Sequence, residues 1–570
     1  MNQSKISTVL VILICALSAI DTTLFVYPSL SYSMPSGCLI LIFALVTMLR
    51  EYRNKNILNA GISTLLIAWL LYVIFFATIR ECELYRTTYI INTLVFIIVL
   101  SINLRNGVVK WKHIENTILT IALFNVCYIV LQIVGKIGST NEFINITGCN
   151  ENPNSTAMYL VIAFAISIHR VLLDRKSKIN YTFAALFLIG IIVLKCRTAI
   201  IGCYIIALLY TVKYYVVERK KYRKGVMAFA FLLISVAVIG GVLLTKKNST
   251  HGRLLVWKTS VQLIKKQPAG YGYGLFEKNY NISQSQYFAS GKGKQGEKTN
   301  ADHVAMAYND YLEMAVDGGV VGMLFLLMLF TLTAIFAYRQ KDIEVLSCVL
   351  AVVVMSMLNF FYSSVGVWIA FCCFIAKVTA IGDERRNSFC QYFLYRLPIF
   401  VGMLSLPLAY RYMSMTASQL KFKTLHEAIS INKVVNESSL KELQKDIETS
   451  EAFYTYQGIN YINLNEYQKA IVALNVASKY SASPAIYYYL WQAYMSIGKY
   501  ESAIKMLNVI EDMLPNHLLP NFYLMNTYLS INDKHNAFYY AKKILNTKEK
   551  IRNQMSEQIK KSAELLLKSN

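Results

Sequence analysis

Long apolar blocks separated by short polar segments are the feature that most constrains this chain. Blocks such as 57–78, 114–134, 226–244 and 320–337 hold about twenty mainly apolar residues each, enough for a helix to cross the hydrocarbon core of a bilayer. Backbone polar groups in that core are satisfied only in helices or closed barrels, and these blocks lack the alternation of barrel strands. The blocks therefore predict an all-α, polytopic helical membrane protein.

The composition agrees with this class, because only 16% of the residues are charged, against the usual quarter of a soluble chain. The hydropathy pattern predicts about twelve or thirteen spans. They lie near residues 7–28, 37–49, 57–79, 88–102, 114–135, 155–169, 180–194, 198–212, 226–244, 319–337, 343–361, 364–381 and 396–413.

Basic residues gather in alternate short connections between the predicted spans. One set of connections is rich in them: Arg50, Arg53, Lys55, Arg105, Lys110, Lys112, Arg170, Arg175, Lys176, Lys178, Lys213, Arg219, Arg339, Lys341, Lys377 and Arg385. The intervening connections hold few, and the positive-inside rule therefore places the N-terminus in the cytoplasm. The net charge of +24 is then a topology signal, and no nucleic-acid partner is expected.

With thirteen spans, residues 1–414 form the transmembrane domain and the polar loop 245–318 lies outside the membrane. Residues 415–570 also lie outside and have mixed charge with helical periodicity. Within them Ala470, Ala503 and Ala537 recur at steps of 33 and 34 residues. This spacing resembles the 34-residue tetratricopeptide repeat, a stack of helix pairs that forms an α-solenoid. We expect a lead-in helix within 420–450, and a protein partner for the repeats or a purely structural role.

The eleven cysteines show no CxxC or zinc-ligand spacing, so no metal site is predicted. Most lie in or beside spans, where cysteine packs as a small apolar residue. Cys82 and Cys149 are both expected outside the membrane and could form a disulfide. The Gly-Lys stretch 290–298 is expected to be flexible.

The order of residues across the outside loop is the most specific pattern in the chain. It reads Gly252-Arg253-Leu254, Trp257, Pro268-Ala269-Gly270-Tyr271-Gly272, Phe276 and Tyr280, then Tyr308-Asn309-Asp310-Tyr311-Leu312-Glu313 and Asp317-Gly318-Gly319. Together with Asn150–Asn154 and Lys195-Cys196-Arg197, it resembles the O-antigen ligase/polymerase superfamily over about 140–380. That superfamily includes O-antigen ligases, O-antigen polymerases and bacterial protein O-oligosaccharyltransferases.

The resemblance implies transfer of a glycan from an undecaprenyl-diphosphate carrier, without a metal or other cofactor, at the periplasmic face of a bacterial inner membrane. Arg197 and Arg253 both lie at the outer ends of predicted spans. Guanidinium groups there suit a diphosphate, because each can bond two oxygens and stabilise the departing charge. We therefore predict that Arg197 and Arg253 bind the carrier diphosphate.

One departure from the superfamily concerns the group that activates the acceptor. The ligase pattern has His-Asn where this chain has Tyr308 and Asn309, and a tyrosine with a pKa near 10 is a poor base at neutral pH. His303, beside Asp302, is a candidate substitute, and Glu313 is another candidate for this catalytic group. Asn309 is expected to position substrate.

Three readings of the function follow from these patterns. A glycosyl transfer explains the arginines and the loop motif, with a protein, lipid A core or a second lipid-linked glycan as acceptor. A lipid-linked glycan flippase would predict repeated spans and ionisable residues at mid-membrane, which the sequence lacks. A scaffold that uses only the repeats leaves the loop motif unexplained.

Overall fold

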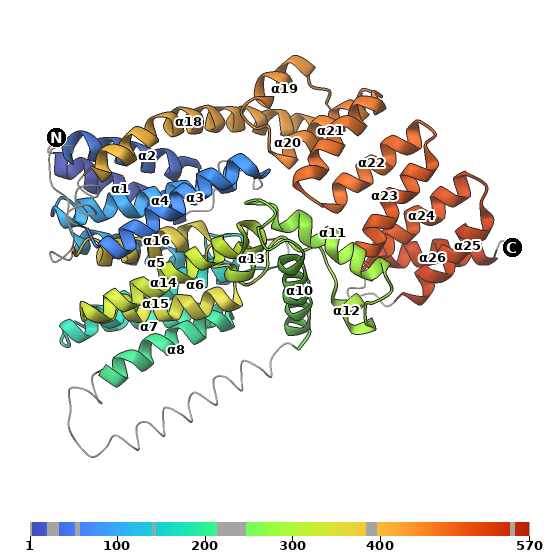
Figure 1. Ribbon diagram of the computed structural model, residues 1–570. Coiled ribbons are helices and arrows are strands. Elements are labelled where there is room, and N and C mark those ends of the chain that lie inside the picture. The colour runs from blue at the N-terminus through green and yellow to red at the C-terminus, as the bar shows by residue number, and fades with distance from the viewer. Residues whose placement is uncertain are drawn as a thin grey trace.

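The computed structural model describes residues 3–19, 34–51, 58–139, 141, 144–213, 247–382, 396–431, 433–547 and 553–568. Within these residues every regular element is a helix (Figure 1), which confirms the all-α prediction. The N-terminal helices form a bundle, and the C-terminal helices form a curved stack beside it (Figure 1).

Five helices of the bundle are long and apolar enough to cross a membrane. They are α3 (Ala60–Ile79), α4 (Leu84–Arg105), α5 (Trp111–Ile133), α6 (Pro153–Leu173) and α14 (Gly319–Arg339). Shorter apolar helices are α1 (Gln3–Ala19), α7 (Lys178–Val193), α8 (Arg197–Thr211), α15 (Ile343–Leu358) and α16 (Val365–Thr379). The total number of spans stays a prediction, because the expected span 226–244 and the end of the first lie outside the described residues.

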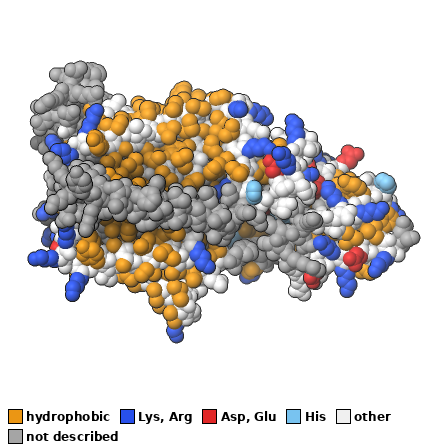
Figure 2. Space-filling model, turned by 90° about the horizontal axis from the view of Figure 1, so that it is seen from below, with side chains coloured by type: hydrophobic (Ala, Val, Ile, Leu, Met, Phe, Trp, Pro, Cys, Tyr) orange, Lys and Arg blue, Asp and Glu red, His pale blue; other side chains and the backbone are white. Residues whose placement is uncertain are grey.

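The surface of the bundle is apolar, as a lipid-facing surface requires. Leu71, Phe75, Phe124 and Ile189 are among the large apolar side chains exposed on it. Figure 2 shows such side chains gathered over the bundle, with lysines and arginines towards its ends. Because lipid tails are as apolar as these side chains, this surface fits a multi-pass membrane protein.

The charged residues of the bundle are sorted between its two ends. At one end, Arg50 Nη2 donates to Asn103 Oδ1 at 2.6 Å, and Lys377 Nζ lies 2.7 Å from Glu344 Oε2. The Glu344 carboxylate also accepts a hydrogen bond from the indole Nε1 of Trp111 at 3.2 Å. Arg50 and Lys377 belong to the connections predicted to be cytoplasmic; Arg53, Lys55, Arg219 and Arg385 of that set lie outside the described residues. Which side of the membrane this end faces stays a prediction.

The expected outside loop is largely helical. It contains α10 (Lys247–Lys266), α11 (Phe276–Ala289), α12 (Gln295–Asn300) and α13 (Asp310–Asp317). The expectation of flexibility over 290–298 is wrong for the part that forms α12. Glu297 orders that helix. Its carboxylate accepts a hydrogen bond from the backbone amide of the N-cap residue Lys294 at 3.0 Å and lies 2.8 Å from Lys258 Nζ.

The glycine motif docks this loop onto the bundle. Tyr271 N donates to the carbonyl oxygen of Val316 at 2.8 Å, and Glu83 N donates to that of Tyr273 at 2.8 Å. Gly272 has a φ of +132°, and a Cβ placed there would overlap the carbonyl oxygen of Glu81. The glycines therefore serve close backbone packing between the loop, α13 and the α3–α4 connection.

Gly272→Ala is expected to lower stability by about 1–3 kcal/mol, since it adds backbone strain and a backbone clash. Gly291→Ala is the matched control, because Gly291 also has a positive φ, of +72°, but a Cβ there would meet nothing within 4 Å. Thermal unfolding of the detergent-solubilised variants measures the difference. Equal losses in both variants would show that packing at Gly272 is not needed.

The possible disulfide between Cys82 and Cys149 does not form, because neither cysteine is part of a disulfide. Cys149 Sγ donates to Asn125 Oδ1 at 2.8 Å, and Cys82 Sγ accepts from Tyr273 N at 3.3 Å. Each thiol thus serves local packing and hydrogen bonding.

A single 34-residue helix, α18 (Leu397–Ser430), runs from the bundle to the C-terminal stack (Figure 1). The predicted boundary at residue 414 falls inside it. It packs closely on α2 (Met34–Glu51), where a Cβ at Gly37 would overlap the Tyr412 ring. The expected lead-in helix over 420–450 is wrong in extent, because the chain turns after α18 and continues as α19 (Glu437–Gln444). Asn460 holds this turn, because its Oδ1 accepts from the backbone amide of Val435 at 2.8 Å and its Nδ2 donates to the carbonyl oxygen of Val435 at 2.9 Å.

The C-terminal stack consists of antiparallel helix pairs. They are α20 (Glu451–Asn463) with α21 (Tyr467–Tyr480), α22 (Pro484–Ser496) with α23 (Tyr500–Met513), and α24 (Leu518–Ser530) with α25 (Lys534–Asn546), followed by α26 (Gln554–Lys568). Ala470, Ala503 and Ala537 are fully buried between them, where small residues let helices approach. Tetratricopeptide identity stays a prediction; the segment is called the repeat domain below.

The repeat domain is docked on the outside loop, and α11 lies against α23 (Figure 1). Gln284 Nε2 donates to the carbonyl oxygen of Met513 at 2.9 Å, and Asn516 Nδ2 donates to that of Thr299 at 3.0 Å. A further bond joins Leu84 N to Thr449 Oγ1 at 2.9 Å. The bundle, the loop and the repeat domain therefore meet at one end of the molecule.

Candidate functional site

The two predicted diphosphate-binding arginines lie on neighbouring elements at this end of the bundle. Arg197 is the first residue of α8, after a turn in which Lys195 has a φ of +52°. Arg253 is in the second turn of α10, where its Nη1 donates to the carbonyl oxygen of Leu358 at 2.6 Å. Both side chains are half-buried.

The charges of these two arginines interact. Burial lowers the pKa of Arg253, and the positive charge of Arg197 lowers it further. Two guanidinium groups this close repel each other, so an anion held between them would relieve the repulsion. The arrangement is chemically suited to a phosphate or diphosphate, since both groups can form two parallel bonds to oxygens.

Tyr308 is the third residue of this group. It adopts a left-handed conformation with a φ of +51°, and its ring centroid lies 5.1 Å from the Arg253 guanidinium and 5.9 Å from that of Phe360. Burial raises the pKa of Tyr308, and Arg253 offsets only part of that rise. The phenol therefore stays protonated at neutral pH and is suited to stacking and hydrogen bonding, not to accepting a proton.

Asn309 and Glu313 hold the local fold. Asn309 is the N-cap of α13, and its Oδ1 accepts from the backbone amides of Tyr311 and Leu312, both at 3.1 Å. Glu313 is buried, with Oε1 3.1 Å from Arg86 Nη2 and Oε2 accepting from Ala307 N at 3.0 Å. A carboxylate bonded in this way orients the segment before α13.

Arg86 is a key residue that the sequence reasoning missed. From the sequence, Arg86 was only one of the few basic residues in the connections expected outside the membrane. In the structure it is 4% exposed, and its guanidinium lies 5.0 Å from the centroid of the Tyr362 ring and 5.8 Å from that of Tyr89. Its position in the first turn of an otherwise apolar helix was the available signal, because an arginine there needs a partner.

Further carboxyl groups surround Arg86. Burial raises the pKa of Glu83 to about 8 and that of Asp317 to about 7, although the positive charge of Arg86 lowers both. Asp317 Oδ2 accepts from Gly274 N at 2.9 Å, which ties the glycine motif to this cluster. These groups form the structural base on which the arginine pair and Tyr308 are placed.

His303 lies on the side of the loop that faces the repeat domain. Its Nε2 is 2.6 Å from Glu277 Oε1, and the other oxygen of Glu277 accepts from Ala482 N at 3.0 Å. The structure brings Arg253 and Tyr308 together, with the charge of Arg197 acting on Arg253, and it places His303 in a separate group with Glu277. Among the described residues, no group of three or more His, Cys, Asp or Glu side chains could hold a metal ion.

The fold and the apolar surface define a polytopic helical membrane protein. Residues 182–327 match the family model described as O-antigen ligase. No curated protein matches the chain. The matched segment contains Arg197, Arg253, the glycine motif and α13, so the match supports a membrane glycan-transfer function. Arg86 and the repeat domain lie outside it.

Proposed function

We propose that this chain is a membrane glycosyltransferase that moves a glycan from an undecaprenyl-diphosphate carrier to an acceptor at the periplasmic membrane face. The observation that carries the proposal is the position of Arg253, against the Tyr308 ring and the carbonyl oxygen of Leu358, within the segment that matches the O-antigen ligase model and also contains Arg197. The two arginines would bind the diphosphate and stabilise its charge as the glycan leaves.

In the proposed reaction an acceptor hydroxyl attacks the anomeric carbon of the glycan, and the bond from that carbon to the diphosphate oxygen breaks. The acceptor proton moves to a base, and undecaprenyl diphosphate leaves with the bonding electrons. No metal is needed, because the two arginines supply the positive charge. We propose the periplasmic face of the bacterial inner membrane as the location, with the N-terminus cytoplasmic and the repeat domain outside.

We keep His303 as the candidate base among the predicted groups; because it lies apart from the two arginines, the acceptor would have to reach from one group to the other. Glu277 holds one ring nitrogen, so the other is oriented and can accept a proton, as in other carboxylate–histidine pairs. Glu313 is less suited, since Arg86 and Ala307 already occupy its oxygens. Asn309 and Tyr308 would position the substrate beside Arg253.

His303→Ala is expected to slow transfer about 10- to 100-fold, near the lower end of general-base contributions, because water can replace a half-exposed imidazole. Tyr308→Phe keeps the ring over Arg253 and is expected to retain most activity. His535→Ala, on the exposed surface of α25, is the matched control. Transfer from a purified lipid-linked donor measures all three, and full activity in His303→Ala would exclude this histidine as the base.

The acceptor defines the alternatives within this reaction. A protein hydroxyl or lipid A core would make the chain an oligosaccharyltransferase or ligase, and a second lipid-linked glycan would make it a polysaccharide polymerase. Profiling of surface lipids and exported proteins after deletion separates these cases. A flippase or a repeat-based scaffold would leave transfer in vitro undetectable.

A further inference from the structure

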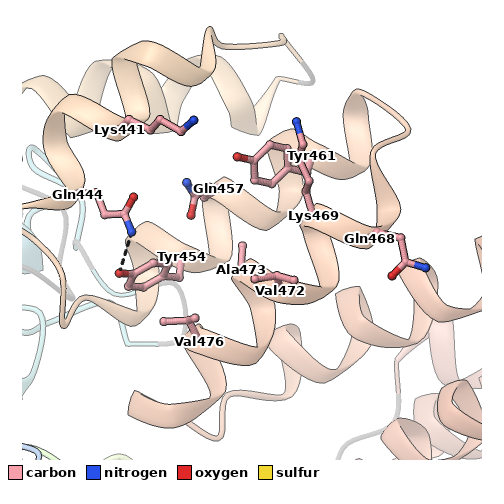
Figure 3. Close-up of a pocket in the computed structure, with 10 residues that line it drawn as sticks. All are labelled: Lys441, Gln444, Tyr454, Gln457, Tyr461, Gln468, Lys469, Val472, Ala473 and Val476. Atoms are coloured by element: carbon pink, nitrogen blue, oxygen red, sulfur yellow. Dashed lines mark hydrogen bonds between the residues drawn. The ribbon is translucent and has the colours of Figure 1, made fainter.

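A groove on the repeat domain lies apart from the arginine pair. It has a volume of about 410 Å³ and is bordered by α19, α20 and α21 (Figure 3). Its lining consists of Lys441, Gln444, Tyr454, Gln457, Tyr461, Gln468, Lys469, Val472, Ala473 and Val476. The volume is within the roughly 300–1,000 Å³ range of small-molecule sites. We infer that this groove binds a short oligosaccharide, independently of the transfer site.

Gln457 is the observation that points to a ligand. Its side chain is 6% exposed, and its amide forms no hydrogen bond to any described residue while it lines the groove. Figure 3 shows the amide between Lys441 and Tyr461, in the space between α19 and α20. The polar atoms of this amide open into the groove, where water bonds them in the free protein, so a ligand that both donates and accepts hydrogen bonds can replace that water.

Neighbouring polar groups extend this hydrogen-bonding surface. Tyr454 and Tyr461 lie on the same face of α20 as Gln457, three and four residues away. Gln444 Nε2 lies 3.5 Å from the Tyr454 hydroxyl, a long contact that leaves this amide able to bond a ligand. Hydroxyl groups, which donate and accept, match a surface made of amides and phenols.

The charges at the rim argue against a strongly anionic ligand. Glu437 lies 2.9 Å from Lys441 Nζ, and Glu466 lies 2.9 Å from Lys469 Nζ, so each lysine has a carboxylate beside it. The ammonium group of Lys469 also lies 5.5 Å from the centroid of the Tyr461 ring. A neutral ligand rich in hydroxyl groups fits this balance better than an acidic peptide.

One wall of the groove is apolar and open. Val472 is 66% exposed, and Val476 lies one turn further along α21. A sugar ring has a C–H face and a hydroxyl edge, so it can pack on these valines while its hydroxyls reach Gln457. An amphipathic helix would instead need a continuous row of apolar residues along the groove. The Gln457 amide interrupts such a row, so the groove suits a helical peptide less well than a sugar.

This binding site goes beyond the proposed function, because it needs no transfer. If the chain also transfers glycans, a second site would raise the local glycan concentration. Loss of the groove would then raise KM and leave kcat unchanged, whereas loss of the arginine pair lowers kcat.

The test applies full-length protein in detergent to an array of bacterial oligosaccharides and helical peptides. Gln457→Leu removes the amide at similar volume and is expected to weaken glycan binding about tenfold, by loss of its hydrogen bonds. Val472→Glu changes an exposed residue, so it folds, and it is expected to weaken binding by a similar factor. Gln492→Ala, on the exposed surface of α22, is the matched control and retains binding.

Two results would overturn the assignment. One is a wild-type protein that gives no glycan signal on the array above the signal of the Val472→Glu variant. The other is binding of peptides but not glycans that is lost in the same variants. Absent glycan binding with intact transfer would reject only the groove, and intact glycan binding without transfer would reject only the proposed function.

Discussion

Arg197→Ala and Arg253→Ala are each expected to slow glycan transfer about 10- to 100-fold, and the double variant about 100- to 10,000-fold if the two effects are independent. Each charge-assisted contact to the diphosphate contributes about 1.5–3 kcal/mol, and the contact tightens as negative charge develops on the leaving group. The two free-energy losses need not add, because the charge of Arg197 acts on Arg253 and both groups would bind the same diphosphate.

Lysine at either position keeps the charge but loses the planar fork, so Arg253→Lys is expected to be impaired as well. Lys265→Ala is the matched control, since Lys265 is an exposed cation near the other end of α10. The measurement is single-turnover transfer from a purified lipid-linked donor by variants that insert normally in the membrane. Wild-type rates in both alanine variants would contradict the proposed site.

Transfer in the presence of EDTA belongs to the same experiment. The proposed mechanism uses the two guanidinium groups where a metal ion would otherwise neutralise the diphosphate. Activity should therefore survive chelation. A strict requirement for an added divalent cation would contradict this mechanism while leaving the arginine contacts to be judged by their own variants.

Arg86→Ala is expected to destabilise the protein by about 3–5 kcal/mol, because it leaves the buried Glu313 carboxylate without its cation. The pair is separated by 3.1 Å, and the Arg86 side chain is 5% exposed. The loss should appear as a lower unfolding temperature in detergent. Arg80→Ala is the matched control, since Arg80 is exposed at the end of α3 and is expected to change stability by less than about 0.5 kcal/mol.

The double variant Arg86→Met with Glu313→Leu separates an ion pair from simple packing. Removing both charges with similar volume is expected to restore much of the stability lost in Arg86→Ala, because neither member of the pair is left as an unpaired buried charge. A double-mutant cycle gives the coupling energy. Purely additive effects of the two single substitutions would show that the pair is not a stabilising unit.

Much of the helical architecture was predictable because it follows from local periodicity. Apolar blocks of about twenty residues define the long bundle helices, and the spacing from Ala470 to Ala503 to Ala537 matches successive helix pairs. The continuous helix α18 was not predicted as one element. Its sequence changes from apolar to charged midway, and only packing against α2 at one end and the repeat domain at the other makes it continuous.

For the site, the sequence by itself predicted where two residues stand along the chain: Arg197 at the start of an apolar helix, and Arg253 after the expected span 226–244. Hydropathy and the loop motif suffice for that, because they are local along the chain. Only the tertiary structure decided their partners. Arg86 meets Glu313 across 227 residues, His303 turns to Glu277 beside the repeat domain, and Tyr308 lies over Arg253. Such pairings depend on how distant segments pack, and no spacing in one sequence encodes the distance between them.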